Sequence, residues 1–373
     1  MKKYRYQYDT QKYPNLTINS KTLFLDIETT GFQRTSTYLT IIGLAWLEGN
    51  QLIIEQWLNE SGHSEEPLLL IELEHFLKNF QTEQNCQPEL IHYNGTTFDL
   101  PYLKSKYEQY HLPTSLPECD SLDLFHLAKK YRSFLSLDGI RQKNLEECFG
   151  LFREDKLSGQ NLIDVYLEGM KQGNKQLLDA YLLHNKEDME GMVFLIHLLR
   201  LHQLFEGSFE IQEWIENEET HSVLIGLSGN FILYQPVNIT MKDIQFTFEK
   251  SSLWIRLPIL SMEARFFYDN YKDYYYLPAE DTAIHKSVAE YVEKEYRIKA
   301  TRKTCYTKKT ASFLPLPLPD SSHLRNTFIK GCTKLDLFYQ CYGGCTAYIL
   351  KDTSCEKKKI YLKQLLQTLL MHL

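Results

Sequence analysis

Three consecutive apolar runs between residues 22 and 58 constrain the fold most strongly. The runs TLFLDIE, YLTIIGLAWLE and LIIEQWL are rich in β-branched and aromatic residues, and only Glu48-Gly49-Asn50 separates the last two. Runs of this length and composition are typical of strands, and a glycine between two polar residues is typical of a tight turn. The segment therefore predicts three strands of an antiparallel meander.

The segments that follow alternate between helical and strand patterns. Apolar residues recur at helical spacing over residues 68–80 and 100–110, and the short apolar run ELIHYN at 89–94 lies between them. Leucines then recur every three or four residues over about 175–204. Strands followed by helix, strand and helix indicate an α/β fold in which helices flank a mixed sheet.

Two carboxylates lie at the end of the first apolar run. Asp26 and Glu28 are two residues apart in FLDIETTG, and side chains alternate between the faces of a strand, so both point to the same face. Adjacent carboxylates repel each other and are costly to bury, which makes a cation their natural partner. Paired acids at a strand end also occur as ordinary surface residues, and the pair alone leaves that alternative open.

Two further motifs carry polar groups in a similar setting. In HYNGTTFDLPYL a strand ends at Asn94 and Asp99 opens a helix, while in LLHNKEDMEGM His184 and Asp188 are four apart and share a helix face. Taken singly, Asp99 is explained as a helix cap and the other pair as a solvated helix face. The occurrence of all three motifs within one α/β domain favours a common site.

The order DIET, NGTTFD, HNKED resembles the DEDD exonucleases of the ribonuclease H-like superfamily, and specifically the YprB-like ribonuclease H-like domain. The resemblance covers about residues 20–205, where RSFLSLDGIRQKNLEECFGL and REDKLSGQNLIDVYLEGM are similar to the connecting helices of that family. It does not extend to the rest of the chain. It implies a ribonuclease H-like fold and four metal-binding carboxylates: Asp26, Glu28, Asp99 and Asp188.

Four acids of this kind suit two hard divalent cations, Mg²⁺ or Mn²⁺, because such ions prefer oxygen ligands. Two ions about 4 Å apart would hold the attacking water and the leaving oxygen of a phosphodiester during an in-line displacement. We expect Asp26 to bridge the ions, Glu28 and Asp188 to lie at the ion that carries the water, and Asp99 to act on the leaving-group side. The 3′-5′ exonuclease polarity comes from the resemblance and not from the spacing.

His184 is the candidate for orienting or deprotonating the water, since an unperturbed imidazole titrates close to neutral pH. The better-known DEDD subclasses have His five residues before the last acid or Tyr four residues before it, whereas here a His occupies the Tyr spacing. The HN-x-x-D form is similar to the YprB-like family. His184 is therefore predicted to be catalytic, with a supporting structural role as the alternative.

Residues around these motifs are candidates for substrate contact. They include the hydroxyls of Thr29 and Thr30 and the side-chain amides of Asn94 and Asn185. The ring of Phe98 is a further candidate, although it is also a candidate core residue. The basic segment at 297–309 adds six cations and no acid, with Tyr296 and Tyr306 beside it. Cations that neutralise phosphates and rings that stack on bases are typical of single-strand binding, although a charge run is also typical of a solvated face. The predicted substrate-binding residues are Thr29, Thr30, Asn94, Phe98, Asn185, Arg302 and Lys303.

The distribution of charge separates two parts of the chain. The net charge of -7 at face value argues against a polyanion-binding protein. That charge is unevenly distributed, because residues 221–373 hold 21 Lys and Arg against 14 Asp and Glu, whereas residues 1–220 hold 20 Lys and Arg against 34 Asp and Glu. A length of 373 residues also predicts two domains. We expect an N-terminal arm at 1–20, a ribonuclease H-like domain at 21–206 and, after an acidic boundary segment, a smaller basic α+β domain at 221–373 that handles substrate or a partner.

Within the basic part, short strands, an amphipathic helix at 282–297 and a terminal helix at 355–373 are predicted. The eight cysteines are too scattered for a disulfide framework, so reduced thiols are expected. The less favoured alternative is a zinc site formed by Cys332, Cys341, Cys345 and Cys355.

The N-terminus lacks the apolar core of a signal peptide, and the chain lacks a long apolar stretch. A cytoplasmic protein that does not bind membranes is expected.

The leading hypothesis is a two-metal-ion 3′-5′ exonuclease that acts on DNA or RNA, at a single-stranded end. One alternative is a non-catalytic nucleic-acid-binding or scaffold protein that has kept the fold. Another is a structure-specific endonuclease with the same metal site. The enzyme is favoured because a binding module gains little from clustered carboxylates that repel phosphate.

Overall fold

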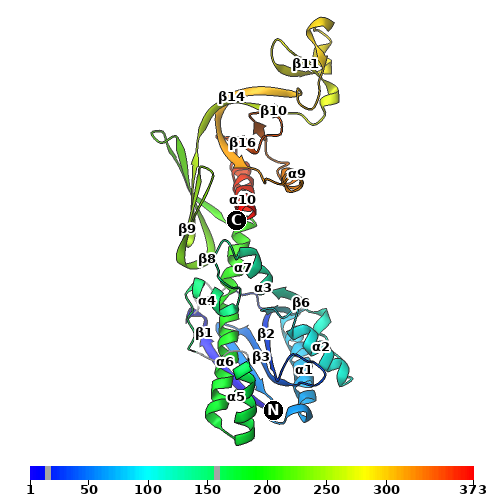
Figure 1. Ribbon diagram of the computed structural model, residues 1–373, viewed down its shortest axis with the longest axis vertical. Helices are drawn as coiled ribbons and strands as arrows, with labels where there is room; N and C mark the ends of the chain where they lie inside the picture. The colour runs from blue at the N-terminus through cyan, green and yellow to red at the C-terminus, as the bar shows by residue number, and fades with distance from the viewer. Residues whose placement is uncertain (13–17, 155–159) are drawn as a thin grey trace. The chain divides into compact units, whose positions relative to one another are not determined.

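The computed structural model describes residues 1–12, 18–154 and 160–373 and divides into two units (Figure 1). The N-terminal unit comprises Met1–His202 with Asn230–Gln235, and the C-terminal unit comprises Gln203–Gly229 with Pro236–Leu373. Part of the predicted N-terminal arm, residues 13–17, and part of the segment REDKLSGQNLIDVYLEGM, residues 155–159, lie outside the described residues.

The N-terminal unit is built on a mixed sheet with strand order β1-β4-β3-β2-β5-β6. The predicted meander is confirmed, because β2 pairs antiparallel with β3 and β3 with β4, and Gly49 at φ 59° makes the turn between the latter two. On the other side of β2, strands β5 and β6 continue the sheet in parallel. The strand bounds are β1 Lys2–Asp9, β2 Thr22–Thr29, β3 Leu39–Glu48, β4 Gln51–Leu58, β5 Glu89–His92 and β6 Asp120–Asp123.

The first strand corrects the prediction of a separate N-terminal arm. Residues Lys2–Asp9 form the edge strand β1, which pairs antiparallel with β4 along its whole length. Tyrosines alternate with charged or polar side chains over most of it, and charges on an edge strand are compatible with strand pairing. The polar composition suggested an arm because an edge strand buries little of its own surface.

Helices cover both faces of this sheet. Leu23, Leu25 and Ile27 of β2 pack in one core with α1 and α2, whereas Ile41 and Leu58 pack in a second core with α5 and α6. The alternating residues of β2, which include the two acids, therefore face α6. The helices of the unit are α1 Glu66–Gln84, α2 Asp99–Gln109, α3 Leu124–Tyr131, α4 Gln142–Phe149, α5 Gln160–Gln172 and α6 Lys175–Phe194. The stretch predicted as one helix to residue 204 divides at Leu195, after which α7 spans Ile196–Phe205.

The C-terminal unit combines sheets with three helices in its described residues. Strands β7, β8 and β9 form one sheet, β10-β14-β16-β15 close into a small barrel, and β12-β11-β13 form a third sheet. The strand bounds are β7 Glu210–Asn217, β8 Ser222–Met241, β9 Ile244–Pro258, β10 Leu260–Phe267, β11 Tyr274–Leu277, β12 Thr282–His285, β13 Ile298–Lys299, β14 Tyr306–Pro317, β15 Phe338–Tyr339 and β16 Thr346–Leu350. The helices are α8 Lys286–Ala289, α9 Ser322–Gly331 and α10 Cys355–His372.

The two units divide between His202 and Gln203, a few residues before the predicted acidic boundary segment 206–220, and that segment itself contains β7, which pairs with the start of β8. One local prediction for this part of the chain is wrong. The amphipathic helix expected at 282–297 is replaced by β12, the single turn α8 and a further turn at Lys294–Tyr296, and Val288 and Tyr291 remain exposed. Helical periodicity stabilises a helix only where a core receives its apolar face, and within the expected helix only the small side chains of Ala283 and Ala289 are buried. The terminal helix is confirmed as α10.

The fold class is confirmed: a mixed sheet flanked by helices, followed by an α+β part. In the part of the chain that the structure describes, no helix has the length and apolar character needed to span a membrane.

Candidate active site

Strand β2 and helix α6 bring the two acidic motifs together. Asp26 is paired across the sheet with Gly43 of β3, and a Cβ on Gly43 would lie 2.7 Å from Asn185 Oδ1 and 3.0 Å from Met189 Sδ, both on α6. A glycine at this position therefore lets the helix approach the sheet closely. This close approach places α6 over the carboxylate of Asp26.

Asn185 connects helix and strand. Its Nδ2 donates to Asp26 Oδ2 at 2.7 Å, and its Oδ1 accepts from Gln56 Nε2 at 2.7 Å. Gln56 also donates to the carbonyl of Leu182, one turn earlier on the helix. Because Asn185 is fully buried, its side chain positions Asp26 and is closed to a substrate, which corrects the predicted substrate contact.

Asp99 is the first residue of α2, as the sequence predicts, and only 5% of it is exposed. Its Oδ1 accepts a hydrogen bond from the backbone N–H of Ile27, the residue between the two acids of β2. Burial raises the pKa of Asp99 to about 7 in spite of that hydrogen bond. The carboxyl group is thus held against β2 by the backbone of the strand itself.

The carboxylates raise one another's affinity for protons. Burial raises the pKa of Asp26 well above its usual range, and the charges of Asp99, Asp188 and Glu28 raise it further. Clustered acids of this kind are costly in their ionised form unless a cation neutralises them. The donor set, which is mainly carboxylate oxygen, fits a hard divalent cation.

His184 and Asp188 lie one helical turn apart and face Glu28. The Nε2 atom of His184 is 3.2 Å from Asp188 Oδ2 and 3.9 Å from Glu28 Oε1. One ligand atom from each of these residues lies within 4.8 Å of the others, and each side chain is 15–19% exposed. Among the described residues this is the one cluster with metal-ligand geometry, so the four C-terminal cysteines do not form one.

A cavity of about 290 Å³ opens over these groups. Four of the five predicted catalytic residues line it, whereas the fifth, Asp99, is not a lining residue and accepts the hydrogen bond from the backbone N–H of Ile27, which does line the cavity. The cavity is lined by Asp26, Ile27, Glu28, Thr29, Gly31, Phe32, Phe98, Leu162, Ile163, His184 and Asp188.

The six predicted substrate-binding residues other than Asn185 divide into three groups. Thr29 and Phe98 line the cavity, and Phe98 also packs edge-on against Phe32 with ring centres 5.7 Å apart. Thr30 and Asn94 are engaged locally: Thr30 Oγ1 accepts from the backbone N–H of Tyr38, and Asn94 Oδ1 accepts from Thr97. Neither of these two lines the cavity. Arg302 and Lys303 are exposed residues of the C-terminal unit.

Arg153 is a residue of the site that sequence reasoning missed. Its Nη1 donates to Asp188 Oδ1 at 2.5 Å, while Nε and Nη2 donate to both oxygens of the fully buried Glu146. Glu146 can approach because Gly191 has no Cβ, which would otherwise lie 1.8 Å from Glu146 Oε1. Although burial favours the neutral guanidine, the hydrogen bond to Glu146 and the charges of both acids raise the pKa of Arg153. No spacing rule relates these residues, which only the packing of α4 on α6 brings together.

One family model matches most of the N-terminal unit. Residues 23–200 match the family model RNase_H_2, described as the RNase H superfamily. Residues 23–200 are thus similar in sequence to the RNase H superfamily. The match ends within α7, and it leaves the C-terminal unit unassigned. No curated protein sequence matches the chain.

Solved structures of E. coli Exonuclease I also match the chain at low similarity. One, in complex with a dA16 oligonucleotide, is 13% identical, covers 56% of this chain and 54% of its own, and has a TM-score of 0.27. The other, a zinc-bound form of an ExoI–ssDNA complex, is 12% identical, covers 55% of this chain and 53% of its own, and has a TM-score of 0.25. The chain thus spans about half the length of these structures.

Proposed function

We propose that this protein is a metal-dependent nuclease that hydrolyses nucleic-acid phosphodiester bonds, and specifically a 3′-5′ exonuclease on DNA or RNA. The observation that carries the proposal is the convergence of Asp26, Glu28, His184 and Asp188 on one cavity of the RNase H-like domain, with Asp99 directly behind them. Such a cluster has no evident structural purpose, because its mutual repulsion opposes folding until a cation binds.

The acids Asp26, Glu28, Asp99 and Asp188 would hold two divalent cations, Mg²⁺ or Mn²⁺, with Asn185 keeping Asp26 in its rotamer. When bound, such ions activate a water molecule and neutralise charge that develops on the phosphate. His184 lies where its ring can orient that water or accept its proton, with Nε2 3.2 Å from Asp188 Oδ2. Arg153 fixes the other oxygen of Asp188 and so leaves Oδ2 directed at His184.

An unpaired nucleotide end is the substrate that the cavity supports best. Phe98 and Phe32 form an edge-on pair at the cavity, and Phe32 is 85% exposed. An exposed ring beside a hydrolytic site offers a surface on which an unpaired base can stack.

The test is incubation of the purified chain with end-labelled single- and double-stranded DNA and RNA, in Mg²⁺, Mn²⁺ or EDTA. We expect cleavage that depends on the cation, that releases nucleotides from the 3′ end, and that Asp26→Asn abolishes. Asp120→Asn is the matched control, because Asp120 is a strand carboxylate of the same sheet whose side chain is 73% exposed.

Each alternative corresponds to a distinct result. Cleavage of an end-blocked or circular substrate would replace the exonuclease by an endonuclease. Binding without cleavage under every condition would leave a non-catalytic nucleic-acid-binding protein. Unchanged turnover in His184→Ala would remove the general-base role from that residue while leaving the carboxylates in place.

A further inference from the structure

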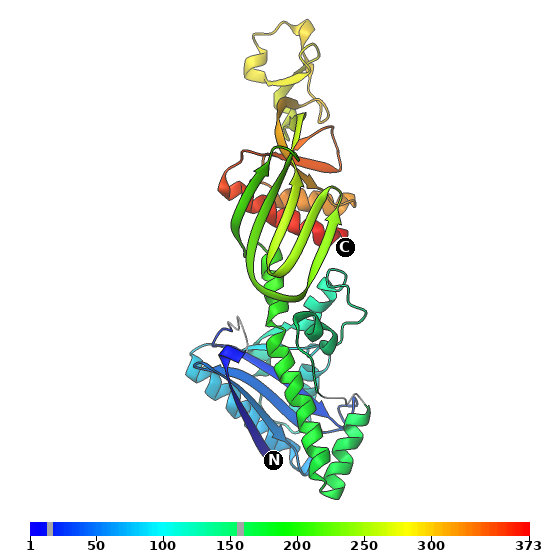
Figure 2. The ribbon, with the colours of Figure 1, turned by 90° about the vertical axis from the view of Figure 1, so that its left-hand side faces the viewer.

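The sheet β7-β8-β9 of the C-terminal unit has one buried face and one open face. Residues at alternate positions of β8 and β9, such as Ile225, Ile255 and Phe246, are buried. They face the side on which α10 lies, where Lys358 of α10 contacts the ring of Trp214 in β7 at 4.1 Å (Figures 1 and 2). The residues between them must point to the opposite face, because side chains alternate along a strand.

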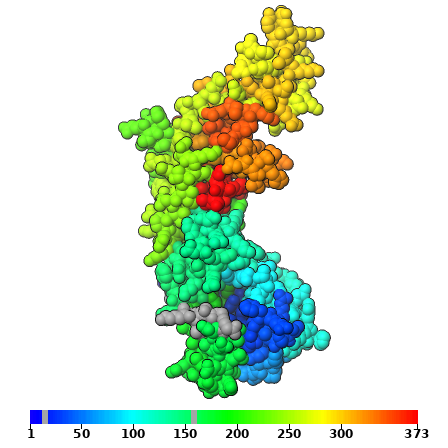
Figure 3. Space-filling view, viewed as in Figure 1, coloured from blue at the N-terminus to red at the C-terminus, as the bar shows by residue number. Residues whose placement is uncertain are grey.

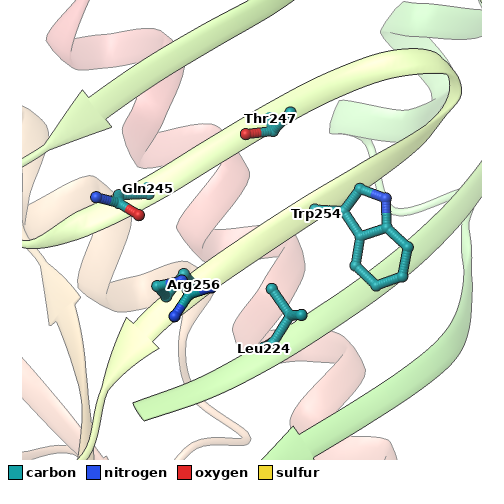
Figure 4. A pocket seen from close by; sticks show the side chains of 5 residues that line it. All are labelled: Leu224, Gln245, Thr247, Trp254 and Arg256. Atoms are coloured by element: carbon teal, nitrogen blue, oxygen red, sulfur yellow. The ribbon is translucent and has the colours of Figure 1, made fainter. Parts of the chain in front are cut away.

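The open face carries an unusual set of side chains around a cavity of about 350 Å³. They are Leu224 of β8 and Gln245, Thr247, Trp254 and Arg256 of β9 (Figure 4). Strand β9 reverses at Lys250, whose φ is 52°, so that Gln245 and Thr247 lie on one arm and Trp254 and Arg256 on the other. The atoms of β8 and β9 lie at the surface of the unit in the space-filling view (Figure 3).

Trp254 lies against Gly226 of the neighbouring strand. A Cβ on Gly226 would lie 2.8–3.3 Å from three atoms of the six-membered ring of Trp254, so only glycine gives the ring this position. Figure 4 shows the indole extending from its own strand towards that of Leu224. Trp254 is half-buried on this face, so part of its ring remains open to a ligand.

The polar groups around the ring lack partners. Within the described chain, no hydrogen bond or ion pair is formed by the four polar or aromatic side chains that β9 contributes: Gln245, Thr247, Trp254 and Arg256. None of the residues that line the cavity is acidic. The site therefore offers a stacking surface, a cation, an amide and a hydroxyl together. A protein partner would need carboxylates to satisfy Arg256, whereas a nucleic acid supplies phosphate, base edges and a ring at once.

We propose that this open face is a binding platform for single-stranded nucleic acid, in which a base stacks on Trp254 and the adjacent phosphate pairs with Arg256. The proposal deepens the proposed function, on which it rests for the choice of nucleic acid as ligand. Only an unpaired base exposes its ring to a tryptophan, so the platform selects single strands. Glu213 pairs with Gly226 across the sheet and lies on the same open face, so the polymer is expected to run over β9 and away from β7.

The platform differs from the basic segment that the sequence suggested. Of the two rings beside that segment, Tyr306 already has the guanidinium of Arg265 4.9 Å from its ring centre, whereas Tyr296 is 58% exposed. Trp254 has no cation or ring partner among the residues the structure describes. What sets Trp254 apart is that its sheet face places a cation, Arg256, beside the ring, an arrangement that composition did not reveal.

The test measures binding of fluorescently labelled oligonucleotides to the full chain in EDTA, so that no cleavage occurs. We expect Trp254→Leu to weaken single-strand binding on the order of tenfold and Trp254→Phe to retain most of it, because Phe stacks and Leu does not. Arg256→Gln should weaken the salt dependence of binding. The negative slope of the logarithm of the association constant against the logarithm of the salt concentration should become less steep by about 0.7, the value for one phosphate contact on a single strand. Lys250→Gln, on the same strand but outside the cavity, is the matched control and should change the affinity least.

The outcomes separate this proposal from the proposed function. Equal binding by wild type and Trp254→Leu would overturn the platform, whether or not the protein cleaves DNA or RNA. Loss of binding in Trp254→Leu, with no cleavage by the wild-type protein in Mg²⁺ or Mn²⁺, would support the platform and overturn the nuclease. Equal losses in Trp254→Leu and Trp254→Phe, or equal affinity for duplex, would overturn base stacking.

Discussion

Replacement of Asn185 by alanine tests whether the contact between α6 and β2 organises the metal site. The variant removes a hydrogen bond to Asp26 and one from Gln56, each 2.7 Å long, at a position without solvent exposure. A buried hydrogen bond to a charged group contributes about 1.5–3 kcal/mol and a neutral one about 0.5–1.5 kcal/mol. Gln56 keeps its bond to the carbonyl of Leu182, so we expect a loss of about 2–3 kcal/mol in the free energy of unfolding.

The effect on metal binding should be distinct from the effect on stability. Removal of a group that orients a metal ligand typically lowers metal affinity or activity by about 10- to 100-fold. Asn174→Ala is the control, because Asn174 caps the start of the same helix by accepting from the N–H groups of Gln176 and Leu177. Loss of that cap should cost about 1 kcal/mol of stability while leaving metal affinity unchanged.

Urea unfolding in EDTA would give the stabilities of both variants, and isothermal titration with Mn²⁺ would give the affinities. The expected pattern is lower stability in both variants but weaker Mn²⁺ binding in Asn185→Ala alone. Wild-type Mn²⁺ affinity in Asn185→Ala would refute the positioning role. Equal loss of affinity in Asn174→Ala would show that general loosening of α6, and not the contact with Asp26, controls the site.

Three further predictions follow from the same contacts. Gly43→Ala should lower the free energy of unfolding by about 1–3 kcal/mol and weaken Mn²⁺ binding, because the Cβ of the alanine would force Asn185 away from the strand. A variant as stable as wild type would contradict this prediction. Burial raises the pKa of Asp99 from its ordinary 3.8 to about 7, so the metal-free folded protein binds this proton more tightly than the unfolded chain does. The bound proton therefore stabilises the folded state below pH 4, and this stabilisation is lost as the pH rises to about 7. Urea unfolding of wild type and Asp99→Asn across this range should show a difference that changes with pH, and saturating Mg²⁺ should reduce it; a constant difference would count against the shift. Arg153→Ala should lower the free energy of unfolding by about 3–5 kcal/mol, because it leaves Glu146 charged and buried without a partner. Addition of Glu146→Gln to this variant should restore part of the loss in urea unfolding. No recovery would mean that the broken ion pair is not the cause of the loss.

The sequence by itself determined the elements that depend on local pattern. The meander of β2, β3 and β4 follows from apolar runs and one turn, and the shared face of Asp26 and Glu28 follows from the two-residue period of a strand. His184 and Asp188 were predicted as one pair because four residues make about one helical turn. The order of these motifs was sufficient to indicate the RNase H-like domain.

Tertiary structure decided what the motifs contact. Arg153 joins the site only because α4 packs on α6, and Asn185 became a support for Asp26 only because Gly43 lets the helix approach the sheet. The open face around Trp254 likewise depends on which side of its sheet α10 covers, and local sequence does not encode that choice. Local periodicity specifies where a side chain lies on its own element, whereas its partners depend on contacts between residues far apart in the chain.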